Sequence, residues 1–187
     1  MIKIGITGSV ASGKSTVAKI LAGRKYPIFD ADREVKKIYQ KKLFKKKIYE
    51  KLNVTNKKEM KKMVINQPKK LTILEQIIHP LVRKKLKDFV KKNRRKKILI
   101  FEIPLLVESK LMNNFHKVIF VNCKKNIRLK RFQSKGKEKK LFSILDKRQL
   151  KPKKKIELSD YVINNNFSIK ILKHNVKIMC KLILNNK

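Results

Sequence analysis

The chain has 187 residues, 42% of them hydrophobic, and a formal net charge of +39. This length and composition predict one compact domain with modest insertions and exclude a disordered tail. The longest apolar stretch, residues 98–107, is far shorter than the roughly 20 residues of a membrane-spanning helix. Cys123 and Cys180 form no C-x-x-C pair, and the N-terminus begins directly with a strand pattern, so we expect a reduced, cytoplasmic protein without a membrane segment.

The 52 basic residues are mostly lysines, and they run along the whole chain. Such a charge attracts polyanions, including nucleic acids and phosphorylated metabolites. The abundance of Lys, Ile, Asn and Phe also fits an AT-rich coding bias, which would give a basic surface without selection for nucleic-acid binding. Lysine lacks the planar fork with which arginine reads phosphates and bases. We therefore expect no specific nucleic-acid partner.

Residues 8–16, GSVASGKST, match the phosphate-loop pattern G-x-x-x-x-G-K-[ST]. Gly8 and Gly13 permit backbone angles that turn the N–H groups of the loop toward phosphate oxygens, and the next helix adds its positive N-terminal end. Lys14 supplies a cation for the β- and γ-phosphates, and the Ser15 hydroxyl can coordinate Mg²⁺. The motif therefore predicts a nucleoside triphosphate with Mg²⁺.

The motif needs a strand before it and a helix after it. Isoleucines alternate with other residues over 1–7, which predicts a buried strand, and apolar residues on one face predict a helix over 16–25. Further strands are predicted at residues 26–30, 98–102, 118–122 and 161–164. Five strands alternating with helices predict a parallel α/β sheet, with the phosphate loop at its carboxyl edge.

The remaining segments have helical patterns. The lysine-rich block from 33 to about 97 is broken near 53–56 and 66–68, and Pro80 is expected to end or kink a helix within it. This block is too long for a simple crossover and is interpreted as an insertion. The basic segment from 126 to about 150 breaks at Gly136, and a closing amphipathic helix starts at Ile169.

The motif alone indicates a nucleotide but no reaction. Switch GTPases usually carry D-x-x-G and N-K-x-D as well, and neither pattern occurs at the required places in this chain. A large mechanical ATPase would need more residues. A small kinase, in which a second substrate lies opposite the nucleotide, remains.

The sequence resembles the dephospho-coenzyme A kinase family over nearly its whole length. The resemblance is carried by short segments whose order and spacing are specific together. They are residues 6–8 before the phosphate loop, Asp30-Ala31-Asp32, His79-Pro80-Leu81, residues 104–108 (PLLVE), Gln149, Lys155 and residues 159–165 (SDYVINN). The resemblance implies ATP-dependent phosphorylation of the ribose 3′-hydroxyl of dephospho-coenzyme A, the last step of coenzyme A synthesis.

The predicted elements and the family resemblance together lead us to expect a P-loop, nucleoside-kinase-like three-layer α/β fold. It would have a five-stranded parallel sheet, a helical substrate-binding insertion and a small lid. The P-loop core would comprise residues 1–32, 98–127 and 151–187. The helical acceptor domain would comprise 33–97, and the lid 128–150. We expect a monomer whose partners are ATP and dephospho-coenzyme A.

Asp32 follows the second strand at the edge where phosphates bind, so its carboxylate can orient the acceptor hydroxyl and accept its proton; the alternative is a helix N-cap. The other implied catalytic residues are Lys14 and Arg131. The implied nucleotide-binding residues are Gly8, Ala11, Ser12, Gly13, Lys14, Ser15, Thr16, Gln149 and Asn165, with Ser15 also as metal ligand. The implied acceptor-binding residues are Asp32, His79, Arg83 and Glu108.

The sequence departs from the family pattern in places. Ala11 stands where the family usually has glycine, so its backbone must be one that alanine tolerates, and Lys135 stands where a second lid arginine is usual. A solvated basic helix is the alternative interpretation of the segment around Arg131. For the whole chain, the alternatives are another small-molecule kinase, such as a nucleoside monophosphate kinase, and a basic nucleic-acid-binding protein with a degenerate ATPase core.

Overall fold

The computed structural model describes residues 1–67 and 70–185, which form two compact units. The first, here called the sheet unit, comprises Met1–Asp30 and Asn93–Lys187. The second, here called the helical unit, comprises Ala31–Lys92. Pro68, part of the expected break at 66–68, lies outside the described residues.

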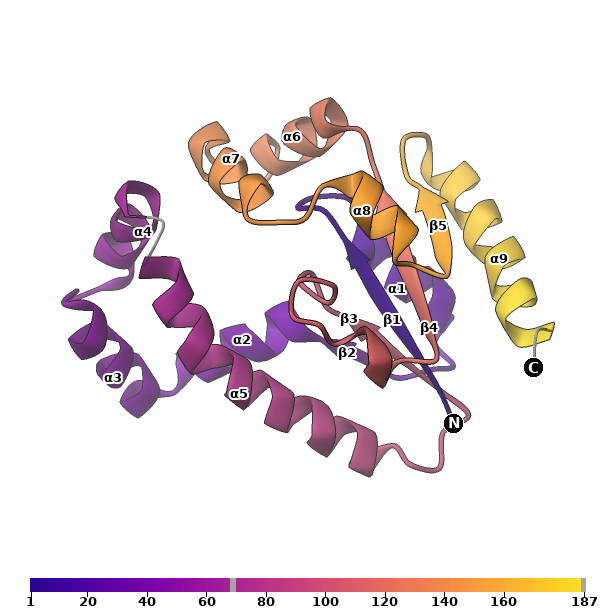
Figure 1. Ribbon diagram of the computed structural model, residues 1–187, viewed down its shortest axis with the longest axis horizontal. Coiled ribbons are helices and arrows are strands. Elements are labelled where there is room, and N and C mark those ends of the chain that lie inside the picture. The colour runs from indigo at the N-terminus through magenta and orange to yellow at the C-terminus, as the bar shows by residue number, and fades with distance from the viewer. Residues whose placement is uncertain (68–69, 186–187) are drawn as a thin grey trace. The chain divides into compact units, whose positions relative to one another are not determined.

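The sheet unit contains five parallel strands in the order β2-β3-β1-β4-β5 (Figure 1). Their bounds are β1 (Ile2–Gly8), β2 (Ile28–Asp30), β3 (Ile98–Glu102), β4 (Lys117–Asn122) and β5 (Tyr161–Asn164). The prediction of a five-stranded parallel α/β sheet is thus confirmed. β1 is the central strand, and Ile6 is paired with Glu102 of β3 and with Ile119 of β4.

Helices α1 (Lys14–Ala22) and α9 (Ile169–Asn185) pack together on the sheet, and both supply residues to one apolar core. That core includes Ile4, Ile6, Val17, Leu21, Ile100, Ile119, Val121, Leu172, Val176 and Met179. Because side chains alternate along a strand, Phe101 points to the opposite face from Ile100. There its ring packs against Phe29 and Phe115, with centroids 6.0 and 5.2 Å away. Both faces of the sheet are therefore covered.

The rest of the sheet unit contributes short helices that lie between β3 and β5 in the sequence. They are η1 (Met112–Asn114), α6 (Lys125–Gln133), α7 (Lys139–Lys147) and α8 (Pro152–Glu157). The structure breaks the basic segment near Gly136, as predicted, because that glycine has φ +68° between α6 and α7. The sequence pattern did not predict α8.

The helical unit consists of α2 (Ala31–Gln40), α3 (Lys42–Leu52), α4 (Lys57–Asn66) and α5 (Lys70–Lys92). A separate apolar cluster holds it together, formed by Ile48, Leu52, Met63, Leu74 and Ile78. The predicted break at 53–56 is confirmed. Asn53 follows α3 in a left-handed conformation, and the Asn56 side chain accepts hydrogen bonds from two N–H groups in the first turn of α4.

Two local expectations differ from the structure. Pro80 was expected to end or kink a helix, and α5 does not end there but continues through it. Pro80 and Gln76, whose carbonyl loses its intrahelical partner, are both exposed, so water can satisfy that carbonyl. Helix α1 ends at Ala22 instead of residue 25 because Gly23 adopts φ +51°, a left-handed helix cap.

Candidate active site

The phosphate loop joins the end of β1 to the start of α1. The Ser12 N–H donates to the Ser9 carbonyl at 3.1 Å, which closes the loop on itself. The Lys14 ammonium is largely buried, and it donates to the carbonyls of Gly8 and Ser9 at 3.1 Å each. The loop therefore curls around a cation, as a site for the phosphates of a nucleotide requires.

Backbone angles explain the residues at 11 and 13. Gly13 has φ +97°, and a Cβ there would collide with Asn165 Nδ2, so glycine is required. Ala11 has φ +58°, in the left-handed region that L-residues rarely adopt. The expectation that alanine tolerates the backbone at this position is thus met only with strain.

A serine and a glutamate from neighbouring elements meet beside the loop. Ser15, in the first turn of α1, donates its hydroxyl to Glu102 Oε1 at 2.6 Å. Glu102 is the last residue of β3 and is only 5% exposed. It is paired in register with Asp30, the last residue of β2. Thr16 lies in the same helical turn, and its N–H donates to the Gly13 carbonyl.

Two amides from distant parts of the chain hold the loop. Asn165, just after β5, donates from Nδ2 to the Ser12 carbonyl at 2.8 Å. Gln149 accepts a hydrogen bond from the Val10 N–H at 2.7 Å and donates from Nε2 to the Gly8 carbonyl at 3.5 Å. The structure therefore brings both of these expected nucleotide-binding residues to the loop. Ser12 Oγ is buried and has no hydrogen-bond partner among the described residues.

Basic side chains of α6 reach the same edge of the sheet. Arg131 Nη1 lies 3.8 Å from the point where a Cβ of Gly13 would stand, and 3.5 Å from Cys123 Sγ. Burial raises the pKa of the Cys123 thiol, and the two nearby arginines partly oppose that shift. Arg128 is buried and donates to Asp146 Oδ1 at 2.6 Å and to the Val10 carbonyl at 3.3 Å. Lys135 lies beyond the end of α6 and is exposed.

Glu108, expected to contact the acceptor, has its carboxylate engaged within the protein. Its Oε1 lies 2.6 Å from the Lys155 ammonium and accepts the Leu150 N–H at 3.0 Å. Sequence reasoning missed the burial of Lys155 and the partnership of Asp146 with Arg128. One signal for the burial of Lys155 was available in the sequence. Lys155 matches a position of the family pattern, whereas the neighbouring lysines match none.

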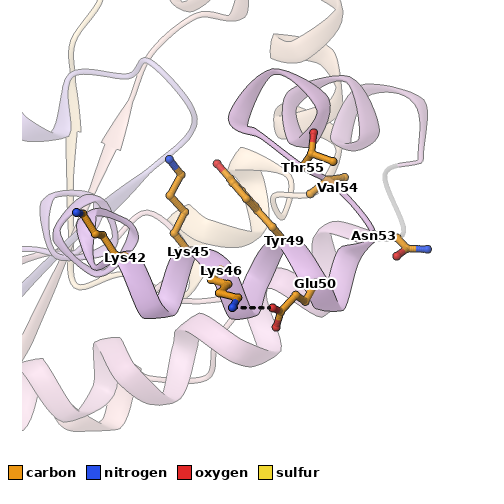
Figure 2. Close-up of a pocket in the computed structure, with 8 residues that line it drawn as sticks. All are labelled: Lys42, Lys45, Lys46, Tyr49, Glu50, Asn53, Val54 and Thr55. Carbon is orange, nitrogen blue, oxygen red and sulfur yellow. Dashed lines mark ion pairs between the residues drawn. The ribbon is translucent and has the colours of Figure 1, made fainter.

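The other three expected acceptor residues lie in the helical unit. Asp32 is exposed in the first turn of α2, and on α5 His79 is half-buried and Arg83 exposed. His79 and Arg83 are four residues apart and so share one helix face. The helical unit also has an open pocket along α3 and the segment after it (Figure 2). It is lined by Lys42, Lys45, Lys46, Tyr49, Glu50, Asn53, Val54 and Thr55.

Among the described residues, no helix is long and apolar enough to cross a membrane. In the same residues, no group of three or more His, Cys, Asp or Glu side chains gathers as a metal site.

The site combines three features. A phosphate loop joins β1 to α1 of a parallel sheet, a Ser–Glu pair lies beside this loop, and an arginine lies close to it. Together these features define a P-loop kinase.

Comparison with known proteins narrows this class. The family model for dephospho-CoA kinase matches residues 2–170. A dephospho-CoA kinase of Fusobacterium nucleatum is 34% identical over 189 residues, covering 96% of this chain and 97% of that protein. The chain belongs to the dephospho-CoA kinase family.

Solved structures agree with the fold. The Thermus thermophilus protein TT1252 superposes with a TM-score of 0.75 at 26% identity, over 95% of each chain. A dephospho-CoA kinase from Campylobacter jejuni superposes with a TM-score of 0.64 at 24% identity, over 97% of this chain and 96% of that one.

Proposed function

We propose that the protein transfers the γ-phosphoryl group of ATP to the ribose 3′-hydroxyl of dephospho-coenzyme A and thereby forms coenzyme A. The single observation that carries this proposal is family membership over nearly the whole chain, joined to an intact phosphate loop around Lys14. The acceptor oxygen forms a bond to the γ-phosphorus, and the bond from that phosphorus to the β,γ-bridging oxygen breaks. ADP leaves, and the hydroxyl proton goes to a base on the protein.

Asp32 is the proposed base. It lies two residues after the carboxyl end of β2 and is exposed, so its carboxylate is accessible to a hydroxyl. A positioned carboxylate of this kind orients the attacking oxygen and accepts its proton in phosphoryl transfer. Lys14 and Arg131 are the proposed cations for the charge that spreads over the transferring group.

Mg²⁺ is the proposed metal, because oxygen donors suit this hard cation. Ser15 Oγ and the Glu102 carboxylate are 2.6 Å apart at the mouth of the loop and are the residues that would hold it, directly or through water. When bound, the ion supplies charge neutralisation to the β- and γ-phosphates.

We propose that residues 33–97 bind the acceptor and that residues 128–150 serve as a lid. The pocket of the helical unit supports the first part, since three of its lining residues are lysines and the acceptor carries a diphosphate. Lys45 lies 5.5 Å from the centre of the Tyr49 ring, so one wall combines a cation with an aromatic surface. The half-buried His79 and exposed Arg83 are further proposed contacts in this unit.

A phosphotransfer assay with ATP, Mg²⁺ and a panel of acceptors tests the proposal. The panel comprises dephospho-coenzyme A, the nucleoside monophosphates and a blank without acceptor. We expect a product with one new 3′-phosphate from dephospho-coenzyme A alone. Equal turnover of a nucleoside monophosphate would assign the protein to another kinase class.

A further inference from the structure

Lys155 is completely buried, although the chain is rich in exposed lysines. It lies in α8, its relative exposure is 0%, and its ammonium is 2.6 Å from Glu108 Oε1. Taking an ammonium out of water carries a penalty of several kcal/mol, which only good partners offset. Burial lowers the pKa of Lys155, while the Glu108 carboxylate opposes that shift. A coding bias toward lysine does not explain a lysine at such a place.

The partner of Lys155 reaches the segment between α7 and α8. The same Glu108 Oε1 accepts the Leu150 N–H at 3.0 Å, so one oxygen joins the buried cation to that backbone. Glu108 Oε2 is buried and has no hydrogen-bond partner among the described residues, and the Lys155 ammonium contacts Oε1 as an ion pair without hydrogen-bond geometry. The orientation of the carboxylate therefore depends on the two contacts of Oε1.

The residue before Leu150 touches the phosphate loop. Gln149 Oε1 accepts the Val10 N–H at 2.7 Å, while the Val10 carbonyl accepts from Arg128 at 3.3 Å. Both backbone groups of Val10 are thus held by side chains. A chain of short contacts runs from Lys155 through Glu108 and the 149–150 backbone to the first half of the loop.

We propose that Lys155 is a positioning residue for nucleotide binding: it orients Glu108, which fixes the 149–150 backbone and so the Val10 end of the phosphate loop. This inference takes from the proposed function only the identity of the nucleotide, which is ATP. Without the ammonium, the buried carboxylate would turn toward water and release the Leu150 N–H. Gln149 would then restrain Val10 less. Ordering the loop around phosphates would therefore cost more conformational entropy.

The test is the affinity for ATP, measured by titration calorimetry without acceptor. Lys155→Met and Gln149→Ala should each weaken binding about tenfold, the equivalent of one hydrogen bond of about 1.4 kcal/mol. Because they act on one relay, the double variant should bind no more weakly than about tenfold. In Lys155→Met the kcat at saturating ATP should change less than about threefold, since the transition-state contacts remain. Lys154→Met, an exposed neighbour in the same helix, is the matched control.

A second pair of variants tests the oxygen at position 108 and covers the case in which Lys155→Met does not fold. Glu108→Gln with Lys155→Met removes both charges but keeps an acceptor for the Leu150 N–H, so ATP affinity should return close to wild type. Glu108→Leu with Lys155→Met has no acceptor and should bind about tenfold more weakly. Removing both members of a buried pair is often neutral for stability, so both variants should fold.

Full additivity of Lys155→Met and Gln149→Ala, or equal ATP affinity of the two charge-free pairs, would overturn the inference. The proposed function fails by a different result. A wild-type protein that binds ATP but does not phosphorylate dephospho-coenzyme A would overturn the function and leave the positioning role of Lys155 in place.

Discussion

Ser15 and Glu102 are 87 residues apart in sequence, and a 2.6 Å hydrogen bond joins their side chains. The bond follows from topology, because β1 and β3 are parallel neighbours and their carboxyl ends meet at one edge of the sheet. It joins the hydroxyl of the phosphate-loop motif to a carboxylate that the motif does not contain. The pair forms the oxygen-lined mouth of the loop.

Glu102→Gln tests whether this carboxylate supports a metal. The amide keeps the shape and an acceptor for Ser15 but loses the charge. Loss of such a supporting group typically lowers metal affinity about 10- to 100-fold, so the Mg²⁺ concentration for half-maximal activity should rise by that factor. The measurement is initial rate against Mg²⁺ at saturating ATP. Glu157→Gln, at an exposed position of α8, should leave the Mg²⁺ requirement unchanged.

Asp32→Asn tests the proposed base. The amide cannot accept the hydroxyl proton, so kcat should fall by about 10²–10⁴ while ATP affinity changes little. Steady-state kinetics and an ATP titration measure the two effects separately. Asp88→Asn, at an exposed position of α5, is the control. Near-normal kcat in the Asp32 variant would leave that carboxylate with only an electrostatic role in the first turn of α2.

Arg131 and Lys135 differ in their distance from the loop. Arg131 Nη1 approaches Gly13, whereas Lys135 is exposed beyond the end of α6. Since the guanidinium fork can bridge two phosphate oxygens, Arg131→Ala should lower kcat by about 10²–10³. Lys135→Ala should have clearly less effect, and neither change should lower the melting temperature much. A more damaging Lys135→Ala would assign the role of the closing cation to Lys135.

Ala11→Gly should stabilise the protein. At φ +58° an alanine has a left-handed strain of about 1–2 kcal/mol, which glycine relieves. Glycine also has more conformational freedom than alanine in the unfolded chain, and this reduces the stabilisation by about 0.5–1 kcal/mol. The net effect should raise the melting temperature by about 1–4 °C. Ala18→Gly, within the regular α1 helix, should lower it, and a lower melting temperature for Ala11→Gly would contradict the assigned backbone angle.

The pH dependence of stability should carry a contribution from Lys155. Burial lowers its pKa in the folded protein below the ordinary value of 10.5, the value expected in the unfolded chain. In the window between these two values the unfolded chain binds more protons, so the free energy of unfolding rises with pH there. The groups facing the ammonium are Glu108, Arg128 and Asp146.

Urea unfolding at several pH values up to about 10 measures this effect. The wild type is compared with the charge-free variant Glu108→Gln/Lys155→Met, in which the contribution of Lys155 is absent. Its stability relative to that variant should grow as pH rises. A difference that stays flat or falls would show that the ammonium keeps an ordinary or raised pKa.

Patterns of apolar residues were sufficient to predict the strands, and the motif G-x-x-x-x-G-K-[ST] was sufficient to predict the phosphate loop. The runs at 98–102 and 118–122 are buried almost throughout, as expected for parallel strands that are covered on both faces. The resemblance to the family then brought Gln149 and Asn165 into the site, although each lies far from the loop in sequence.

What escaped prediction depends on tertiary contacts. Lys155 looks like any other lysine in a basic helix, and only the packing of α8 reveals that it is buried. The pairing of Arg128 with Asp146 crosses the break at Gly136, so no helical spacing connects them. Pro80 carries a strong helix-ending preference, but the continued burial of neighbours such as Ile78 outweighs it.

The phosphate loop is completed only after much later parts of the chain have been synthesised. Asn165, which holds the Ser12 carbonyl, follows 153 residues later. At a synthesis rate of about 5–20 residues per second, these residues take about 8–30 s to emerge. Strand β1 must also wait for β3 and β4, its two neighbours in the sheet. The nascent chain therefore leaves the isoleucine-rich central strand without its neighbours for several seconds, and unpaired apolar strands of this kind are prone to aggregation.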